Sequence, residues 1–209
     1  MHKVIPGILE KDWLEIEKKI EIAKEFTNTI HIDIIDGIFA DNITFMDPKP
    51  FSKYSKDFNL EVHLMVDNPL QYLEGFANAG FKRFIGHIEK MENLEEFVAK
   101  GQMLGEVGLA LDIQTPVDSI NVSFDDLDLI LLMGVKAGKS GQEFVPDVLA
   151  KIASIREKNS IPIEVDGGIN DKTIIDIKNA GADEFVVTSA LFSNQNPKVA
   201  YETLNKLLN

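Results

Sequence analysis

The chain has 209 residues, of which 44% are hydrophobic, so its length suits one large domain or two small ones. Its formal net charge of −13 argues against nucleic acid as a partner, because phosphate backbones attract basic surfaces. No stretch reaches the roughly 18 unbroken apolar residues of a membrane helix, which argues against a membrane partner. The N-terminus lacks the apolar core of a signal peptide, so we expect a cytoplasmic protein. Without cysteine, a metal site must use histidine and carboxylate ligands.

Strand-like and helix-like segments alternate from one end of the chain to the other. The predicted strands are Lys3–Leu9, Thr29–Ile35, Leu60–Val66, Arg83–His87, Val107–Asp112, Leu127–Met133, Ile161–Asp166 and Glu184–Thr188. The predicted helices are Trp13–Phe26, Pro69–Ala79, Leu94–Gly101, Pro116–Asn121, Val145–Lys158, Lys172–Ala180 and Pro197–Leu208, and Pro48–Tyr54 follows the helical pattern least well. Proline is typical of the first turn of a helix and stands at two predicted helix starts, Asn68-Pro69 and Thr115-Pro116. Glycine is typical of helix ends and stands at two of them, Gly80 and Gly181.

Eight such strand–helix units without a linker or low-complexity tract predict one (β/α)₈ TIM-barrel domain over residues 1–209. The structural alternative is an open doubly wound sheet. That fold would place a G-x-G-x-x-G phosphate turn after the first strand, where this chain reads IPGILEKD.

Polar side chains stand near the ends of three apolar strands, in HIDIIDG, EVHLM and EVDGG. Residues two apart share one face of a strand, so His31 and Asp33 point the same way. Catalytic residues of a barrel lie at the carboxyl ends of its strands, where His63 and Asp166 also stand. A histidine and an aspartate two residues apart, such as His31 and Asp33, would on their own more often be a hydrogen-bonded pair at the rim of the barrel. Two imidazoles and two carboxylates together favour a divalent metal site or a two-base proton-transfer site.

Three further polar residues accompany this set. Glu61 and Glu164 precede His63 and Asp166 by two positions, so they face the interior one layer deeper. They either pair with other groups inside the barrel or orient the ligating side chains. His87 ends the fourth strand and is either a supporting group or a hydrogen-bonded rim histidine.

Glycine-containing loops follow the sixth, seventh and eighth strands. A single loop of this kind would more often be an ordinary turn. Three together predict a phosphate-binding rim, since phosphate sites of this fold often form from the loops after the last strands. Lys139 is either an added cation at that rim or a solvated loop residue. Met65 and Met133, at the ends of two strands, are core residues or an adaptable apolar floor.

These residues, in this order, resemble the ribulose-phosphate 3-epimerase family over essentially the whole chain. The resemblance runs through HIDIIDGIFADNITF, EVHLMVDNP, VGLALDIQTPV, DLDLILLMGVKAGKSGQEFVP and IEVDGGIND to TSALF. It implies a TIM barrel that interconverts D-ribulose 5-phosphate and D-xylulose 5-phosphate by moving a proton at C3 through an enediolate.

The resemblance also assigns roles by position. It implies that His31, Asp33, His63 and Asp166 bind one divalent metal, for which zinc, iron, manganese and cobalt remain open, and that Asp33 and Asp166 are the acid–base pair. It implies that the phosphorylated ketose contacts His63, Gly138, Lys139, Ser140, Gly141, Gly167, Gly168, Thr188 and Ser189, above a floor of Ile35, Met65 and Met133. The family commonly forms homo-oligomers, so we expect one here.

The chain departs from the family pattern around the substrate. The family's first strand usually reads P-S-I-L with its serine at the substrate, whereas Gly7 stands there in this chain. Ile35 replaces a methionine, the sixth loop reads KAGKSGQ instead of N-P-G-F-G-G-Q, and Thr188 replaces the glycine of a G-S turn. The metal positions persist, so the reaction type is kept and the sugar is the open question. The alternatives are a 3-epimerase of another ketose phosphate, such as a hexulose 6-phosphate, and a non-catalytic sugar-phosphate-binding barrel.

Overall fold

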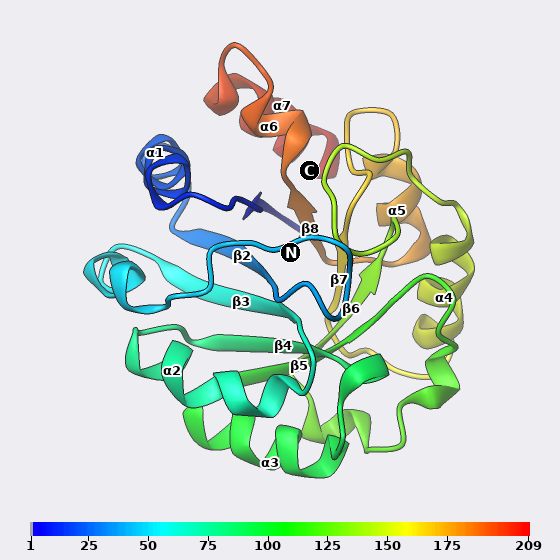
Figure 1. Ribbon diagram of the computed structural model, residues 1–209. Helices are drawn as coiled ribbons and strands as arrows, with labels where there is room; N and C mark the ends of the chain where they lie inside the picture. The colour runs from blue at the N-terminus through cyan, green and yellow to red at the C-terminus, as the bar shows by residue number, and fades with distance from the viewer. Residues whose placement is uncertain (1) are drawn as a thin grey trace.

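A computed structural model describes residues 2–209, and in this range eight parallel strands close into a barrel in chain order. Helices lie around the outside of the barrel (Figure 1). This architecture confirms the predicted (β/α)₈ fold. The strands are β1 (Lys3–Ile8), β2 (Thr29–Ile35), β3 (Asn59–Met65), β4 (Arg83–His87), β5 (Glu106–Leu111), β6 (Leu129–Met133), β7 (Ile163–Asp166) and β8 (Glu184–Val187).

Every connection between successive strands contains an α-helix or a short 3₁₀-helix. The α-helices are α1 (Trp13–Ala23), α2 (Leu73–Asn78), α3 (Leu94–Leu104), α4 (Asp147–Arg156), α5 (Ile174–Ala180), α6 (Ser189–Phe192) and α7 (Pro197–Leu208). The 3₁₀-helices are η1 (Lys49–Tyr54), η2 (Pro69–Tyr72), η3 (Ile88–Lys90), η4 (Val117–Ser119) and η5 (Phe124–Asp126). None of the helices in residues 2–209 is both long enough and apolar enough to cross a membrane.

Helix ends follow local sequence chemistry. Asp12, Asn93 and Asn196 each accept a hydrogen bond from a backbone N–H in the first turn of α1, α3 and α7. Gly181 ends α5 with φ of 116°, a left-handed conformation that favours glycine. Side-chain caps therefore mark the starts of α1, α3 and α7, and a glycine marks the end of α5.

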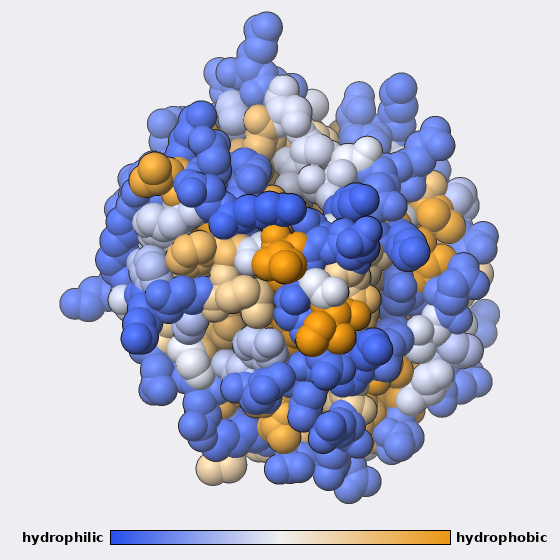
Figure 2. Space-filling view, in the orientation of Figure 1, coloured by the Kyte–Doolittle hydropathy of each residue, from blue (hydrophilic) through white to orange (hydrophobic). Residues whose placement is uncertain are grey.

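Two apolar layers hold the barrel. The larger lies between the outward faces of the strands and the helices and includes Ile30, Ile32 and Phe185. The smaller fills the interior near the carboxyl ends of the strands with Ile35, Met65 and Met133 among its members. Figure 2 shows a largely hydrophilic surface with a few hydrophobic residues gathered near the centre of this face.

Two helix predictions are wrong in detail. Pro116–Asn121 forms only the 3₁₀ turn η4, because the backbone is extended at Pro116 before the turn and again at Ile120 after it. The segment Pro69–Ala79 divides into η2 and α2. The short helix α6 was not predicted, because four residues are too few to show a helical period.

Candidate metal centre and active site

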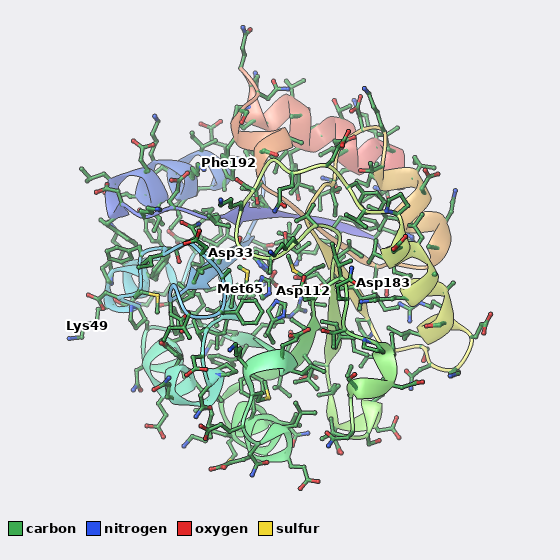
Figure 3. All side chains as sticks on the ribbon, turned by 45° about the vertical axis from the view of Figure 1, so that its right-hand side comes forward. Asp33, Lys49, Met65, Asp112, Asp183 and Phe192 are labelled. Atoms are coloured by element: carbon green, nitrogen blue, oxygen red, sulfur yellow. The ribbon has the colours of Figure 1, made fainter. Side chains whose placement is uncertain are left out.

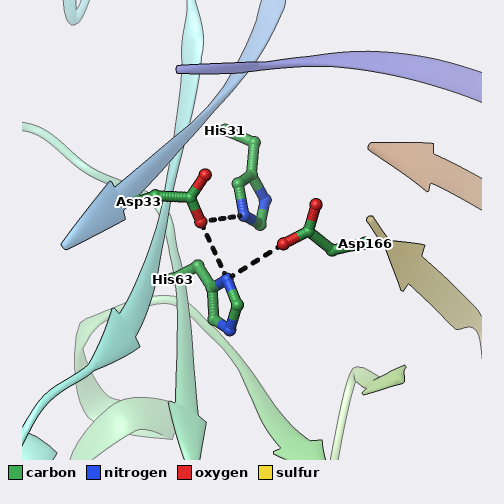
Figure 4. Close-up of side chains that lie close together, drawn as sticks. All are labelled: His31, Asp33, His63 and Asp166. Atoms are coloured by element: carbon green, nitrogen blue, oxygen red, sulfur yellow. Dashed lines mark hydrogen bonds and ion pairs between the residues drawn. The ribbon is translucent and has the colours of Figure 1, made fainter. Parts of the chain in front are cut away.

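Strand register brings four polar side chains into one buried cluster, His31, Asp33, His63 and Asp166, called here the four-residue cluster (Figure 4). Asp33 in β2 pairs in register with His63 in β3, and Asp166 ends β7. Asp33 Oδ1 lies 3.0 Å from His63 Nδ1 and 3.3 Å from His31 Nε2. Asp166 Oδ2 lies 3.6 Å from His63 Nδ1. Both histidines are fully buried.

The four-residue cluster fits a divalent cation. One ligand atom from each residue lies within 4.8 Å of all the others. A tetrahedral site with ligand bonds of about 2.1 Å spaces its donor atoms roughly 3.4 Å apart, which matches the separations of 3.0–3.6 Å above. Two carboxylates and two neutral imidazoles carry a charge of −2, which a divalent ion balances. Without the ion, burial disfavours a charge on His31, but Asp33 beside it raises the pKa of His31, and a protonated His31 offsets part of this negative charge.

Glu61 orients His31 from the layer beneath. Glu61 Oε1 lies 2.7 Å from His31 Nδ1, so this nitrogen donates to the carboxylate and Nε2 is left free to face Asp33. The register pairs Glu61 with His31 across β2 and β3. Glu61 therefore supports the histidine of the neighbouring strand and not His63, two residues along its own strand.

Arg83 organises the charged layer at the amino ends of the strands. Its guanidinium contacts Glu61 Oε2 at 3.1 Å, Glu164 Oε2 at 3.5 Å and the carboxylate of Glu184. Glu164 Oε1 also lies 3.2 Å from His31 Nδ1. Burial, together with the nearby charge of Glu61, raises the pKa of Glu164 to about 8. At neutral pH this layer thus combines a protonated Glu164 with an ionised Glu61 and Arg83.

Asp33 keeps its negative charge in the interior. Burial alone would raise its pKa, but the charge of His31 and hydrogen bonds from His31 and His63 hold the pKa of Asp33 well below its usual range. An ionised carboxylate in a dry site is a suitable proton acceptor and a suitable metal ligand.

His87 supports the cluster from β4. Its ring stacks on His63 with centroids 5.0 Å apart and packs against Phe39. Nδ1 of His87 lies 2.9 Å from Glu89 Oε2, and Nε2 has no hydrogen-bond partner among residues 2–209. Burial lowers the pKa of His87, so the ring is neutral at pH 7. Its position fits the supporting role considered from the sequence.

A pocket opens above the four-residue cluster at the carboxyl ends of the strands. Figure 3 shows Asp33 and Met65 near the middle of the molecule, in contrast to Lys49 at its edge. The lining includes twelve of the residues expected from the sequence: Asp33, Met65, Met133, Gly138, Lys139, Ser140, Gly141, Asp166, Gly167, Gly168, Thr188 and Ser189. Four more, which sequence reasoning missed, are Leu9, Val135, Ile169 and Val186.

Three expected residues lie beneath this lining. His31 and His63 are at its base and fully buried, and Ile35 packs with Met65 and Met133 in the inner apolar layer. The apolar floor is therefore continuous, with isoleucine in one of its three places.

The loop after β6 folds over the pocket and is tied to the loop after β2. Asn42 Nδ2 donates to the carbonyl oxygen of Gly138 at 2.9 Å, and Gln142 Nε2 donates to the carbonyl oxygens of Lys136 and Lys139. The loop after β7 packs tightly below, since a Cβ on Gly168 would lie 2.6 Å from Phe144 Cα. Asn42 was missed because nothing in its sequence signals a contact 96 residues away.

Comparisons with known proteins identify the family of this chain. The model of the ribulose-phosphate 3 epimerase family matches residues 3–192. Ribulose-phosphate 3-epimerase of Bacillus subtilis is 36% identical, and the match covers 96% of each chain. The Schizosaccharomyces pombe enzyme of the same name is 34% identical over 94% of this chain and 89% of its own. A rice relative named as the cytoplasmic isoform is 32% identical over 98% of this chain and 93% of its own.

Solved structures confirm the fold at lower identity. 3-Hexulose-6-phosphate synthase from Salmonella typhimurium superposes with a TM-score of 0.75 at 12% identity, covering 100% of this chain and 98% of that one. The family match spans β1 to α6, including every strand that contributes to the four-residue cluster. The chain therefore belongs to the ribulose-phosphate 3-epimerase family.

Proposed function

We propose that this protein is a metal-dependent epimerase that interconverts D-ribulose 5-phosphate and D-xylulose 5-phosphate. The observation that carries the proposal is the four-residue cluster, which places two carboxylates and two imidazoles at the base of a pocket rimmed by glycine loops. Relatives at 34% and 36% identity carry that enzyme name over nearly their whole length, which supports the same reaction here.

The reaction needs a base and an acid on opposite faces of one carbon. Asp33 and Asp166 approach the centre of the cluster from β2 and β7, on opposite sides (Figure 4). One carboxylate removes the C3 proton, and the other, in its neutral form, returns a proton to the opposite face. Each positioned group typically contributes about 10²–10⁴-fold to the rate. The reverse reaction exchanges the two roles.

We propose His31, Asp33, His63 and Asp166 as the ligands of one divalent metal, with zinc, iron, manganese and cobalt all compatible with this ligand set. A bound divalent ion would supply positive charge beside the substrate oxygens and so stabilise the enediolate that forms at C2 and C3. Glu61 keeps the Nε2 atom of His31 directed at the cluster. The buried floor excludes water from the reacting carbon.

The phosphate group is proposed to bind at the loops after β6, β7 and β8. Their backbone N–H groups can approach an anion closely where glycine removes the side chain, as at Gly167 and Gly168. Lys139 lines the same pocket and supplies a positive charge in an otherwise acidic protein. Ser140 and Ser189 add hydroxyl donors to this rim.

We further propose that residues 1–209 act as one domain, that the protein forms a homo-oligomer in the cytoplasm, and that neither nucleic acid nor membrane is its partner. The closed barrel, the net charge of −13 and the name of the rice relative support these points.

A direct comparison of two substrates tests the proposal. The protein loaded with each candidate metal is assayed for 3-epimerisation of ribulose 5-phosphate and of a hexulose 6-phosphate. We expect turnover of the pentulose at a kcat/KM well above that of the hexulose. Turnover of the hexulose alone would contradict the substrate assignment. Binding of either phosphate without turnover by the metal-loaded protein would instead support a non-catalytic barrel.

A further inference from the structure

Two departures from the family pattern, Gly7 and Thr188, meet inside the barrel. Gly7 lies in β1, which is hydrogen-bonded to β8, and Thr188 directly follows β8. A Cβ placed on Gly7 would lie 2.5 Å from Thr188 Oγ1 and 2.7 Å from Val186 Cγ1. Side-chain atoms do not approach so closely. The Thr188 side chain therefore occupies space that a side chain at position 7 would fill.

This shared position borders the reacting centre. Gly7 pairs in register with His31 across β1 and β2. Thr188 lines the pocket together with Asp33 and Asp166. The Thr188 side chain thus lines the same pocket as the two carboxylates of the four-residue cluster and the glycine loops of the phosphate rim.

Among residues 2–209, the Thr188 hydroxyl does not cap the helix that it precedes. Thr188 stands at the N-cap of α6, where threonine usually accepts a hydrogen bond from the first turn. Its side chain makes no such bond to residues 189–192. A hydroxyl that lines a pocket and does not cap its own helix can bind a ligand.

We propose that Thr188 is a specificity-determining residue whose Oγ1 hydrogen-bonds to a sugar oxygen of the ketose phosphate, and that Gly7 is the residue that makes room for it. This inference rests on the proposed substrate class. The hydroxyl belongs to the residue directly after β8 and lies beside Gly7 of β1, so its donor and acceptor directions differ from those of a side chain at position 7. It therefore selects among the hydroxyl configurations of the bound sugar.

The first test compares ligand affinity in Thr188→Val, which keeps the side-chain shape but removes the hydroxyl. Ribitol 5-phosphate is the probe, because it has the sugar oxygens and the phosphate but no ketone to react. Loss of one hydrogen bond should weaken its binding about 3- to 10-fold, and inorganic phosphate should bind with unchanged affinity. Thr188→Ser should restore the affinity for ribitol 5-phosphate. Thr203→Val, on exposed α7 where the hydroxyl bonds to Val199 O, is the matched control.

Unchanged affinity of Thr188→Val for ribitol 5-phosphate would overturn the inference. So would an equal loss for inorganic phosphate, because the hydroxyl would then belong to the phosphate site.

The second test measures whether positions 7 and 188 are coupled. Gly7→Ala should lower kcat/KM by about tenfold or more in the wild-type background, because the new Cβ displaces Thr188 and also crowds Val186. The same substitution should cost clearly less in a Thr188→Gly background, with thermal melting used to show that each variant is folded. Equal costs in both backgrounds would contradict the pairing.

The binding measurement also separates this inference from the proposed function. Absence of turnover by the wild-type enzyme would reject the epimerase proposal, whereas the affinities for ribitol 5-phosphate and phosphate decide the role of Thr188 without any reaction.

Discussion

Asp33 contacts both histidines of the four-residue cluster, at 3.0 Å from His63 and 3.3 Å from His31. It is also buried, which ordinarily favours the neutral acid. The two imidazoles reverse that preference and keep the carboxylate ionised. A buried base of this kind works only while its partners stay in place, and Glu61 fixes one of them through a 2.7 Å hydrogen bond.

Removing either catalytic carboxyl group should stop the reaction. Asp33→Asn and Asp166→Asn each keep the side-chain size but remove one proton-transfer group and weaken one ligand. We expect each to lower kcat at least about 10²-fold while circular dichroism shows an intact barrel. Asp171→Asn, an exposed carboxylate in the loop after β7, is the control and should keep wild-type turnover. Near-normal activity in either site variant would mean that the acid–base pair is wrongly assigned.

At the scale of elements, the loop after β2 is braced against its own strand. Thr44 Oγ1 donates to the carbonyl oxygen of Asp33 at 2.9 Å and accepts from Ile35 N at 2.9 Å. Ile43 forms an antiparallel bridge with Asp36. The end of β2, which presents Asp33, is therefore rigid on both sides, as a preorganised site requires.

Asp36 joins the loops after β2 and β3. Its carboxylate accepts hydrogen bonds from the backbone N–H groups of Ile38, Phe39 and Asp67 at 2.7–3.0 Å. Burial opposes ionisation, but these hydrogen bonds, that from Asp67 first, lower the pKa of Asp36 below its usual 3.8. Because the folded-state pKa is lowered, the stabilisation is complete above the unfolded-state pKa and disappears as the pH falls through the folded-state pKa.

Asp36→Ala should therefore destabilise the protein in a pH-dependent manner. We expect its free energy of unfolding at pH 7 to fall by about 1–2 kcal/mol, with a smaller difference from wild type near pH 3.5. Urea unfolding at both pH values measures this, and Asp41→Ala, exposed in the same loop, is the control. A difference that is constant or grows toward acid would contradict the role given to the charge.

At the scale of the whole molecule, the fold and the four-residue cluster follow from sequence, because strand alternation shows which residues face inward. The side-chain contacts between neighbouring strands cannot be predicted in this way, because a local sequence pattern does not determine the register of strand pairing. Glu61 was thus placed in the right layer, but its contact with His31 emerged only from the pairing of β2 with β3. Gly7 and Thr188 stood as two separate departures until the closing of β1 onto β8 brought them together.

A bound metal should stabilise the whole barrel, since it links β2, β3 and β7. At a free concentration about 100 times its Kd, a ligand of the native state adds roughly 2.7 kcal/mol. For a chain of this size, removal by a chelator should lower Tm by about 5–10 °C, and adding the metal back should restore it. If neither chelator nor added metal changed the Tm, the four residues would hold no metal.

The most direct test of the account is solvent exchange at C3. Ribulose 5-phosphate is incubated with the metal-loaded enzyme in D₂O, and the position of deuterium is read by NMR. We predict that the xylulose 5-phosphate formed carries solvent deuterium at C3 and none at C1, and that the chelated enzyme catalyses no exchange. Absence of C3 exchange with metal bound, or full exchange in Asp33→Asn and Asp166→Asn, would contradict a two-carboxylate proton transfer at this site.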